Sequence, residues 1–316
     1  MKKTLAVFCA LVLLLIPVFS MSACSSSKPV IGIIQFGSHA SLNNCYDGIM
    51  KGLRDGGIDP DAYRIEYLNS NFDPSVSQSQ ANTLVNRKAK VIIAIATPST
   101  VAAAGAADGE DIPVVFCAVT DSTVMENYKN ITGSSDIPNF DRQLETVTAT
   151  MGKSDLKIGV LYSTDESSSP VQVANLKKAA EKYEGMEILD SAVADITTID
   201  TKVNDFLDQG ADCFVNLLDN TIVGKLETNI LPLTNAKKVP VFGSEIEQVK
   251  IGCAACASVE YLDVGAAAGK AAARILGGEA ASSIPVATIS DPKEYYNSRV
   301  IAAFGLQTPN GTDVKG

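Results

Sequence analysis

The chain has 316 residues, a formal net charge of −10 and a hydrophobic fraction of 46%. Binding to nucleic acid through phosphates, or to anionic lipid through charge, needs clustered Lys and Arg, so an acidic chain is expected to do neither. The high hydrophobic fraction and the near absence of low-complexity sequence indicate well-buried cores rather than disorder.

The first 23 residues have the organisation of a secretory signal. Two lysines precede an apolar run from Leu5 to Phe19, which is too short for a membrane-spanning helix, and small residues lead to Cys24. This arrangement resembles the cleavage site of bacterial lipoproteins. By that resemblance residues 1–23 are removed, Cys24 is acylated (a palmitate-type anchor), and residues 24–28 tether an extracytoplasmic protein to the cell membrane. An ordinary cleaved signal with a chance cysteine is the alternative.

From Val30 onward, short apolar runs alternate with segments of helical period, which is typical of βα units and parallel sheets. An alanine-rich helix is expected from Tyr261 to Leu276, and Ser169-Pro170 is expected to open another helix, with proline in its first turn. Two series of units joined near residues 133–140 predict two Rossmann-like α/β lobes. The runs predicted as strands are 30–34, 63–67, 91–96, 113–119, 157–162, 186–193, 213–217, 239–242 and 252–259.

Apart from Cys9 and Cys24, five cysteines remain, an odd number with no disulfide-framework spacing. Cys117 and Cys213 lie in apolar strand-like runs, where cysteine acts as a small hydrophobe. Cys253-Ala-Ala-Cys256 matches a C-x-x-C pattern, but no helix follows it and no second ligand pair is present. A redox or zinc role is the alternative; we expect core thiols.

Seven blocks occur in the order known from one family: 33–39, 93–98, 115–121, 131–136, 158–163, 218–221 and 239–245. The chain resembles the substrate-binding lipoproteins of ABC importers, in the type I periplasmic-binding-protein group that includes the tryptophan-type aromatic amino acid binders. The match covers essentially the whole mature chain. One segment departs from it: the family has His-Pro-x-Leu-Asp where this chain reads His39-Ala40-Ser41-Leu42-Asn43, which affects the expected ligand contact of the first lobe.

The resemblance implies two Rossmann-like lobes with parallel sheets, joined by a hinge of three chain crossings. Lobe 1 would contain residues 29–135 and 261–286, and lobe 2 residues 136–260 and 287–310. The expected function is capture of a small ligand, an aromatic or apolar amino acid, between the lobes and its delivery to an ABC permease with its ATPase. A ligand-sensing lipoprotein, or a binder of nucleosides or other small polar solutes, is the alternative.

Polar residues follow the predicted strands, where open α/β sheets bind ligands. Thr97-Pro98-Ser99-Thr100 opens a helix whose free N–H groups would suit a carboxylate, although Ser99 can also simply cap that helix. The candidate ligand-binding residues are Phe36, Ser38, His39, Thr97, Ser99, Thr100, Thr120, Asp121 and Ser135 in lobe 1, and Tyr162, Ser163, Ser168, Ser169, Asp219, Asn220, Thr221, Ser244 and Glu245 in lobe 2.

These candidates suggest a clamp for a zwitterion. Ser99, Thr100 and Thr120 would bind an α-carboxylate, and Asp219, or Glu245 as second choice, would bind an α-ammonium, since a buried carboxylate needs a partner of opposite sign. Phe36 and Tyr162 would flank an apolar or aromatic side chain. The alternatives are that Asp219 caps the next helix and that both rings are plain core. On the clamp hypothesis, replacing Asp219 by alanine abolishes binding and leaves the melting temperature within a few degrees.

Enzymatic chemistry is not expected. His39 is the only histidine, so any serine or cysteine hydrolase would have to use it as base. The sequence contains no G-x-S-x-G, H-E-x-x-H or Walker motif, and we expect no metal or cofactor. His39 is interpreted as a cleft hydrogen-bonding residue, or as a surface residue at a helix start.

Overall fold

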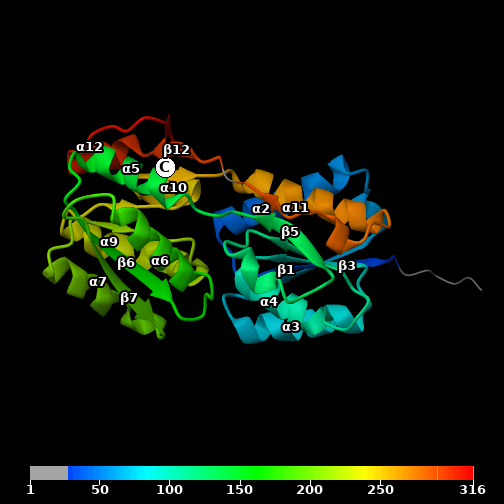
Figure 1. Cartoon of the computed structure of the whole chain (residues 1–316). Helices are drawn as coiled ribbons and strands as arrows, with labels where there is room; N and C mark the ends of the chain where they lie inside the picture. The colour runs from blue at the N-terminus through cyan, green and yellow to red at the C-terminus, as the bar shows by residue number, and fades with distance from the viewer. Residues whose placement is uncertain (1–27, 290, 316) are drawn as a thin grey trace, which may run out of the picture.

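The computed structural model describes residues 28–289 and 291–315, which form two α/β lobes side by side (Figure 1). The predicted signal and the lipid-bearing Cys24 lie outside the described residues. Within the described part of the chain, no helix is both long and apolar enough to cross a membrane.

Lobe 1 is built on a six-stranded parallel sheet in the order β11-β5-β4-β3-β1-β2. Helices α2 (Ala40–Asp55) and α11 (Tyr261–Leu276) pack on one face, and α3 (Pro74–Asn86) and α4 (Thr97–Ala107) on the other. Because both faces are covered, the central strands are continuously apolar rather than alternating. The strands are β1 (Val30–Gln35), β2 (Arg64–Asn69), β3 (Val91–Ile95), β4 (Val114–Cys117), β5 (Ile131–Ser135) and β11 (Ala287–Thr288).

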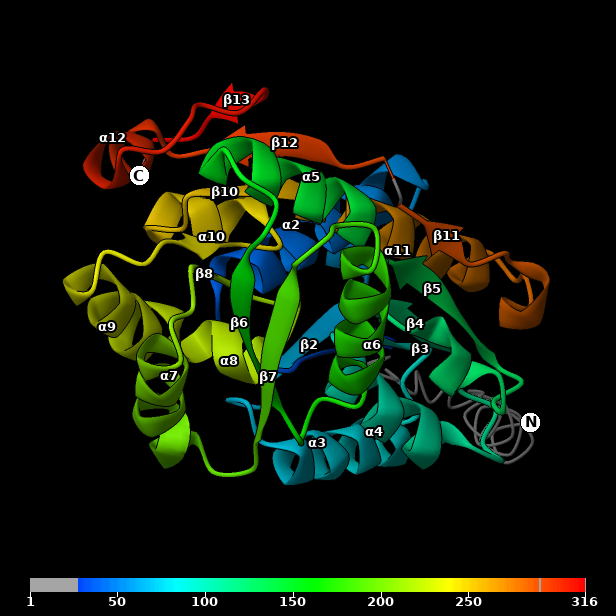
Figure 2. The same cartoon turned by 60° about the vertical axis from the view of Figure 1, so that its left-hand side comes forward.

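Lobe 2 has a four-stranded parallel sheet in the order β7-β6-β8-β9, formed by β6 (Lys157–Ser163), β7 (Glu187–Val193), β8 (Cys213–Val215) and β9 (Val241–Phe242). In Figure 2, α6 and α7 flank β6 and β7 on opposite sides. The helices of this lobe are α5 (Phe140–Met151), α6 (Ser169–Ala180), α7 (Ile199–Asp208), α8 (Asn220–Lys225), α9 (Leu231–Ala236), α10 (Ile246–Ile251) and α12 (Ser298–Phe304).

The two main sheets are parallel, as the sequence predicts, and a small third sheet adds an antiparallel pair. In it β10 (Ala255–Ser258) runs antiparallel to β12 (Lys293–Tyr296), and β13 (Thr312–Asp313) runs parallel to β12. Short helical turns complete the described elements: η1 (Pro60–Ala62), η2 (Ser122–Met125), η3 (Ile196–Thr198), η4 (Leu226–Ile230) and η5 (Ala281–Ser283).

The chain passes between the lobes after β5, before α11 and between β11 and β12. Since β11 pairs with β5 and Ile289 N donates to Ser135 O at 3.0 Å, the third crossing lies after Ile289 rather than at residue 286.

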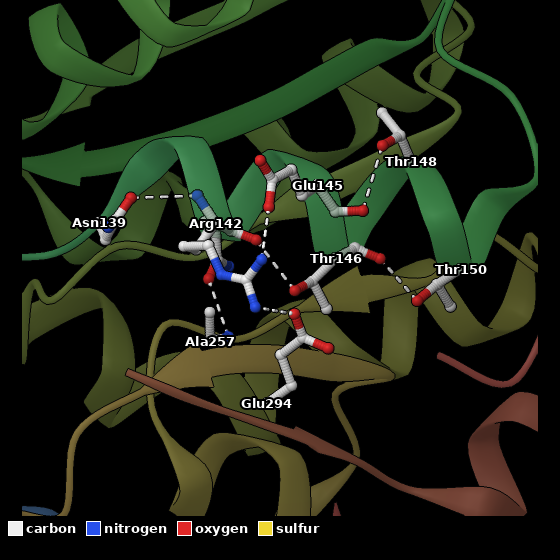
Figure 3. Close-up of polar contacts among 9 residues, drawn as sticks. Asn139, Arg142, Glu145, Thr146, Thr148, Thr150, Ala257 and Glu294 are labelled. Carbon is white, nitrogen blue, oxygen red and sulfur yellow. Dashed lines mark hydrogen bonds and ion pairs between the residues drawn. The ribbon is translucent and has the colours of Figure 1, made fainter. Parts of the chain in front are cut away.

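Within lobe 2, side-chain hydrogen bonds connect the segments that follow the first and the third crossing. Arg142 of α5 reaches Glu294 of β12 at 2.8 Å and also Glu145, and Asn139 caps α5 (Figure 3).

All five described cysteines are free and buried, which agrees with the interpretation as core thiols. Cys45 and Cys117 lie in the core of lobe 1. Cys213 lies in one of the two core clusters of lobe 2, and Cys253 and Cys256 lie in the other.

Helices α2 and α11 pack backbone against backbone through four glycines, Gly48, Gly52, Gly265 and Gly269. A Cβ atom on Gly265 would lie 2.2 Å from the carbonyl oxygen of Cys45, and one on Gly48 would lie 2.2 Å from that of Leu262. Both helices begin at the interface between the lobes, so their close packing fixes where their first turns lie.

We therefore predict that Gly265→Ala lowers the free energy of unfolding by about 2 kcal/mol, because the added methyl group meets backbone that cannot move aside. Gly105→Ala on α4 is the matched control, because the nearest atom to its added Cβ is 3.9 Å away. The control should leave stability unchanged or raise it by up to about 1 kcal/mol. Denaturant unfolding measures both; equal effects of the two substitutions would contradict the packing account.

Candidate functional site

Both parallel sheets change strand order at one point, between β1 and β3 in lobe 1 and between β6 and β8 in lobe 2. In open α/β sheets the crevice at such a point, beyond the carboxyl ends of the strands, is where ligands bind. Loops from both lobes meet there and line a narrow cavity, in which the open space is about 20 Å³. That space holds about one water molecule, so a larger ligand requires the lobes to part or the wall side chains to move.

The cavity is lined from both lobes. Lobe 1 and the hinge contribute residues at the starts of α2, α4 and α11 and at the ends of β4 and β5, whereas lobe 2 contributes residues at the starts of α8 and α10. The lining residues are His39, Ser41, Leu42, Thr97, Ala118, Thr120, Asp136, Leu218, Asn220, Val223, Glu245, Gln248 and Tyr261.

Direct hydrogen bonds join the lobes across this interface. Ser41 Oγ donates to Glu245 Oε2 at 2.5 Å, and His39 Nε2 lies 3.1 Å from Asn220 Oδ1. Further out, Asn44 Nδ2 donates to Glu247 Oε1 at 3.2 Å. The lobes are therefore closed on each other, and α2, together with its N-cap residue His39, supplies the lobe 1 side of these three bonds.

Two alanines at the carboxyl ends of β3 and β4 have backbone conformations that favour glycine. Ala96 has φ of +76° and Ala118 has φ of +56°. Strain of this kind is concentrated at binding and catalytic sites, where the surrounding structure imposes it. Ala96 is the N-cap residue of α4, and directly after it the first N–H groups of that helix, from Thr97 and Ser99, have no partner within the helix.

Two carboxyl groups, those of Asp136 and Glu245, line the cavity. Asp136 lies at the first hinge crossing and accepts hydrogen bonds from Thr120 Oγ1 at 3.1 Å and Tyr261 Oη at 2.7 Å. Because Tyr261 begins α11 at the second crossing, this carboxyl links two of the chain crossings. Glu245 caps α10, accepting from the N–H groups of Glu247 and Gln248 as well as from Ser41.

Burial raises the pKa of each of these carboxyls. The pKa of Asp136 is raised by burial, against the lowering effect of its hydroxyl donors, and burial raises the pKa of Glu245 to about 7. Behind the cavity, burial and the charge of Asp219 raise the pKa of Glu166 to about 8. No lysine or arginine lines the cavity, and among the described residues no ion pair involves any of these carboxyls.

Of the residues proposed from the sequence, the structure places five on the cavity wall: His39, Thr97, Thr120, Asn220 and Glu245. The other lobe 1 candidates do not line it. Ser99, Thr100 and Ser135 are buried with their hydroxyls bonded inside the lobe, Phe36 is core, Ser38 is exposed, and Asp121 is half-buried and caps η2.

The remaining lobe 2 candidates also lie behind the cavity wall. Tyr162 is half-buried against the core of lobe 2, and Thr221 is half-buried on α8. Ser163, Ser168, Ser169 and Ser244 are buried and hydrogen-bond within their own lobe.

Asp219 caps α8, which is the alternative that the sequence left open. Its carboxylate accepts from Ile222 N at 3.0 Å, Ser163 N at 2.6 Å and Ser169 Oγ at 2.7 Å, and the residue has no exposed surface. Burial raises its pKa and these donors oppose the rise. All of these partners of Asp219 lie inside lobe 2. The bond from Asp219 to a ligand ammonium remains a prediction from the sequence.

Sequence reasoning missed four polar residues on the wall: Ser41, Asp136, Gln248 and Tyr261. Asp136 directly follows β5, so the strand-end rule that selected Ser135 would have found it one residue later. Tyr261 opens the alanine-rich helix. Gln248 lies in the first turn of α10, three residues after Glu245, and no motif marks it.

A two-lobed α/β chain with parallel sheets and a cavity between the lobes has the type I periplasmic-binding-protein fold. A structure described as an ABC domain in complex with L-Trp from Streptococcus pneumonia superposes on this chain with a TM-score of 0.84 at 29% identity, covering 91% of this chain and 100% of that one. A ligand-free, open structure of a substrate-binding protein with adhesive properties from Clostridium difficile gives 0.66 at the same identity, covering 91% and 99%. The lower score against the open structure agrees with the closed lobes.

The family model for ABC transporter substrate-binding proteins matches residues 30–315, and the chain belongs to that family. It is therefore a binding protein and not an enzyme. A curated relative, the "Tyrosine-binding protein" of Clostridioides difficile (strain R20291), is 31% identical over 299 residues, covering 92% of this chain and 85% of the relative.

The position of Asp219 generates a prediction opposite to the one made from the sequence. Asp219→Ala should lower the stability of the ligand-free protein by about 2–4 kcal/mol, because a helix cap is lost and buried donors are left without an acceptor. Asp195→Ala, which removes the exposed cap of η3, should cost less than about 1 kcal/mol. Thermal unfolding without ligand compares them, and an unchanged melting temperature for Asp219→Ala would refute the cap as its main role.

The raised carboxyl pKa values predict how stability depends on pH. Glu166 and Glu245 titrate near 8 and 7 in the folded chain instead of at the ordinary 4.5, so the native state holds more protons than the unfolded state in that interval. The free energy of unfolding of the ligand-free protein should therefore fall as pH rises from about 5 to about 8.

Glu166→Gln should flatten this pH dependence, whereas Glu279→Gln, which removes an acid paired with Arg274 at the surface, should leave the slope unchanged. Melting temperatures measured across the interval provide the comparison. A stability that is constant or rises with pH would show that these carboxyls are not buried as described.

Proposed function

We propose that this protein captures an aromatic or apolar amino acid between its lobes outside the cytoplasm, is held at the cell membrane by a lipid on Cys24, and delivers the ligand to an ABC permease with its ATPase. Family membership and the relatives described as binding tyrosine and L-Trp support the ligand class. The signal-like first 23 residues support the location.

The observation that carries the amino acid ligand is the charge of the cavity wall. Asp136 and Glu245 are both almost fully buried there, and no cationic side chain accompanies them. Keeping a carboxylate ionised away from water is costly unless a positive partner is present. An α-ammonium group supplies that charge, and Asp136 is its principal partner because fewer donors already bond to it than to Glu245.

The opposite end of the ligand has a place at the start of α4. The N–H groups of Thr97 and Ser99 have no partner within the helix, and the positive end of a helix dipole favours an anion. Thr120 and Thr100, expected from the sequence to donate to a carboxylate, instead donate to Asp136 and to the Ala96 carbonyl. The α-carboxylate is therefore assigned to the backbone of α4 together with the side chain of Thr97, and Leu42, Leu218 and Val223 supply apolar wall.

A thermal-shift screen of the chain from Ser25 onward tests the ligand class with the amino acids, nucleosides and common sugars. A ligand at about 100 times its dissociation constant adds about 2.7 kcal/mol of stability, so only true ligands raise the melting temperature by several degrees. Shifts with aromatic or apolar amino acids are expected. Shifts in melting temperature only with nucleosides or sugars would overturn the proposal of an amino acid ligand. They would leave the assignment to the family of ABC transporter substrate-binding proteins unchanged.

Asp136→Asn tests the ammonium site. It should weaken the binding of the best amino acid by about 100-fold or more, because it removes the charge and keeps the size. Asp121→Asn, a nearby carboxyl that does not line the cavity, should change the dissociation constant by less than about threefold. Calorimetric titration compares the variants; wild-type affinity in Asp136→Asn would place the ammonium elsewhere.

A further inference from the structure

The cavity wall contains two buried polar atoms that the zwitterion clamp does not use. Gln248 Nε2 and His39 Nδ1 have no hydrogen-bond partner among the described residues, although both side chains line the cavity. A buried donor or acceptor without a partner costs about 1–3 kcal/mol. A ligand in the cavity can satisfy both atoms, because both side chains line it.

The Gln248 amide has a fixed orientation. Its Oε1 accepts from the backbone N–H of Ser244 at 3.1 Å and from Asn216 Nδ2 at 3.0 Å. Because a backbone N–H can only donate, the amide oxygen must face Ser244 and the amide nitrogen must face away from it. Gln248 has no exposed surface. Its Nε2 is therefore a donor that requires an acceptor from the cavity.

The tautomer of His39 follows from a chain of hydrogen bonds that crosses the lobes. Asn220 Nδ2 donates to Glu166 Oε2 at 2.7 Å, and Asn220 Oδ1 lies 3.1 Å from His39 Nε2. Above a pH of about 8 Glu166 is ionised and can only accept, so the amide nitrogen of Asn220 faces it and the amide oxygen faces His39. Nε2 of His39 then carries the proton. Burial lowers the pKa of His39, which favours the neutral ring and leaves Nδ1 as an acceptor.

Stacked rings hold His39 in this position. Its ring lies parallel to that of Phe72, at an interplanar angle of 6° and a centroid distance of 6.4 Å, and Phe72 in turn meets Phe36 edge-on at 5.8 Å. Gly37 makes room for this arrangement, since a Cβ there would lie 2.1 Å from the Phe72 ring. Phe36, expected from the sequence to flank the ligand, instead supports the ring that positions His39.

We infer that Gln248 and His39 bind the side chain of the ligand, and that this side chain carries a group that both accepts and donates a hydrogen bond. This inference rests on the proposed function, in which Asp136, Glu245 and the start of α4 bind the head group. A phenolic hydroxyl both accepts and donates, an indole N–H only donates, and a phenyl ring does neither. The site therefore prefers tyrosine to tryptophan and tryptophan to phenylalanine.

Calorimetric titration of the chain from Ser25 onward with L-tyrosine and L-phenylalanine tests the inference, at a pH above the value of about 8 at which Glu166 ionises. The wild-type protein should bind tyrosine at least about 30-fold more tightly, since phenylalanine leaves two buried polar atoms without partners. Gln248→Glu keeps an oxygen facing the N–H of Ser244 and replaces the Nε2 donor. His39→Gln keeps a donor to Asn220 and removes the Nδ1 acceptor.

Each variant should reduce the preference for tyrosine to within about threefold and change the phenylalanine dissociation constant by no more than about threefold. Gln248→Met, which also lacks the donor, replaces Gln248→Glu if that variant fails to fold. Ser38→Ala, at an exposed position, is the control and should keep the preference for tyrosine.

Equal binding of both amino acids by the wild-type protein overturns the inference alone. Equal weakening of both amino acids in the variants also overturns it, because the two residues would then bind the head group. Absence of binding by any amino acid overturns the proposed function as well.

Discussion

Buried carboxyl groups without a cationic partner, between the two lobes, are the constraint on which the rest of the structure depends. Asp136 and Glu245 line the cavity, and Glu166 and Asp219 lie behind it, all nearly without exposed surface. Hydroxyl, amide and backbone donors stabilise them, but no ion pair formed by the described residues involves any of the four. A fold that only had to be stable would replace such groups by apolar ones. In the proposed function, the ammonium group of the ligand is the positive partner that these groups lack in the ligand-free chain.

The hinge and the α2–α11 pair connect the buried carboxyl groups to the positions of the two lobes. Asp136 lies on one crossing and accepts from Tyr261 on another, so a group bound to its carboxyl contacts a point where two of the crossings are linked. The glycine contacts between α2 and α11 hold Ser41 and Tyr261 as parts of one rigid unit. In the proposed function, a ligand that neutralises Asp136 also lowers the cost of closing lobe 2 onto that unit, where Ser41 donates to Glu245. Binding and closure are in this way one equilibrium.

The sequence predicted the fold well because periodicity and strand-end chemistry are local properties. The helix predicted from Tyr261 to Leu276 has those bounds in the structure, and α6 begins at Ser169 as its proline indicates. The strand-end rule also found His39, Thr97, Thr120, Asn220 and Glu245, because parallel strands bring their carboxyl ends to one edge of a sheet. The small antiparallel sheet of β10 and β12 was not predicted, because its pairing depends on where the chain returns after the third crossing.

The roles of individual side chains were harder to predict, because they depend on partners distant in the sequence. Asp219 could face a ligand or cap its helix. Its carboxylate caps α8 through Ile222 N and also accepts from Ser163 and Ser169, about 50 residues earlier, and local sequence does not reveal these two distant donors. Gln248 is identified as a site residue only from the structure. Ser244 and Asn216 fix the orientation of its amide group, and its amide nitrogen has no partner among the described residues.

The most direct test of the account removes one end of the ligand at a time. Calorimetric titration would compare L-tyrosine with tyramine, which lacks the carboxylate, and with 3-(4-hydroxyphenyl)propionate, which lacks the ammonium. The account predicts that each deletion weakens binding by about 100-fold or more, with the larger loss for the propionate, because it leaves the buried carboxylates without a positive partner. Binding of the propionate as tightly as L-tyrosine would contradict the claim that the charge of the cavity selects the ligand.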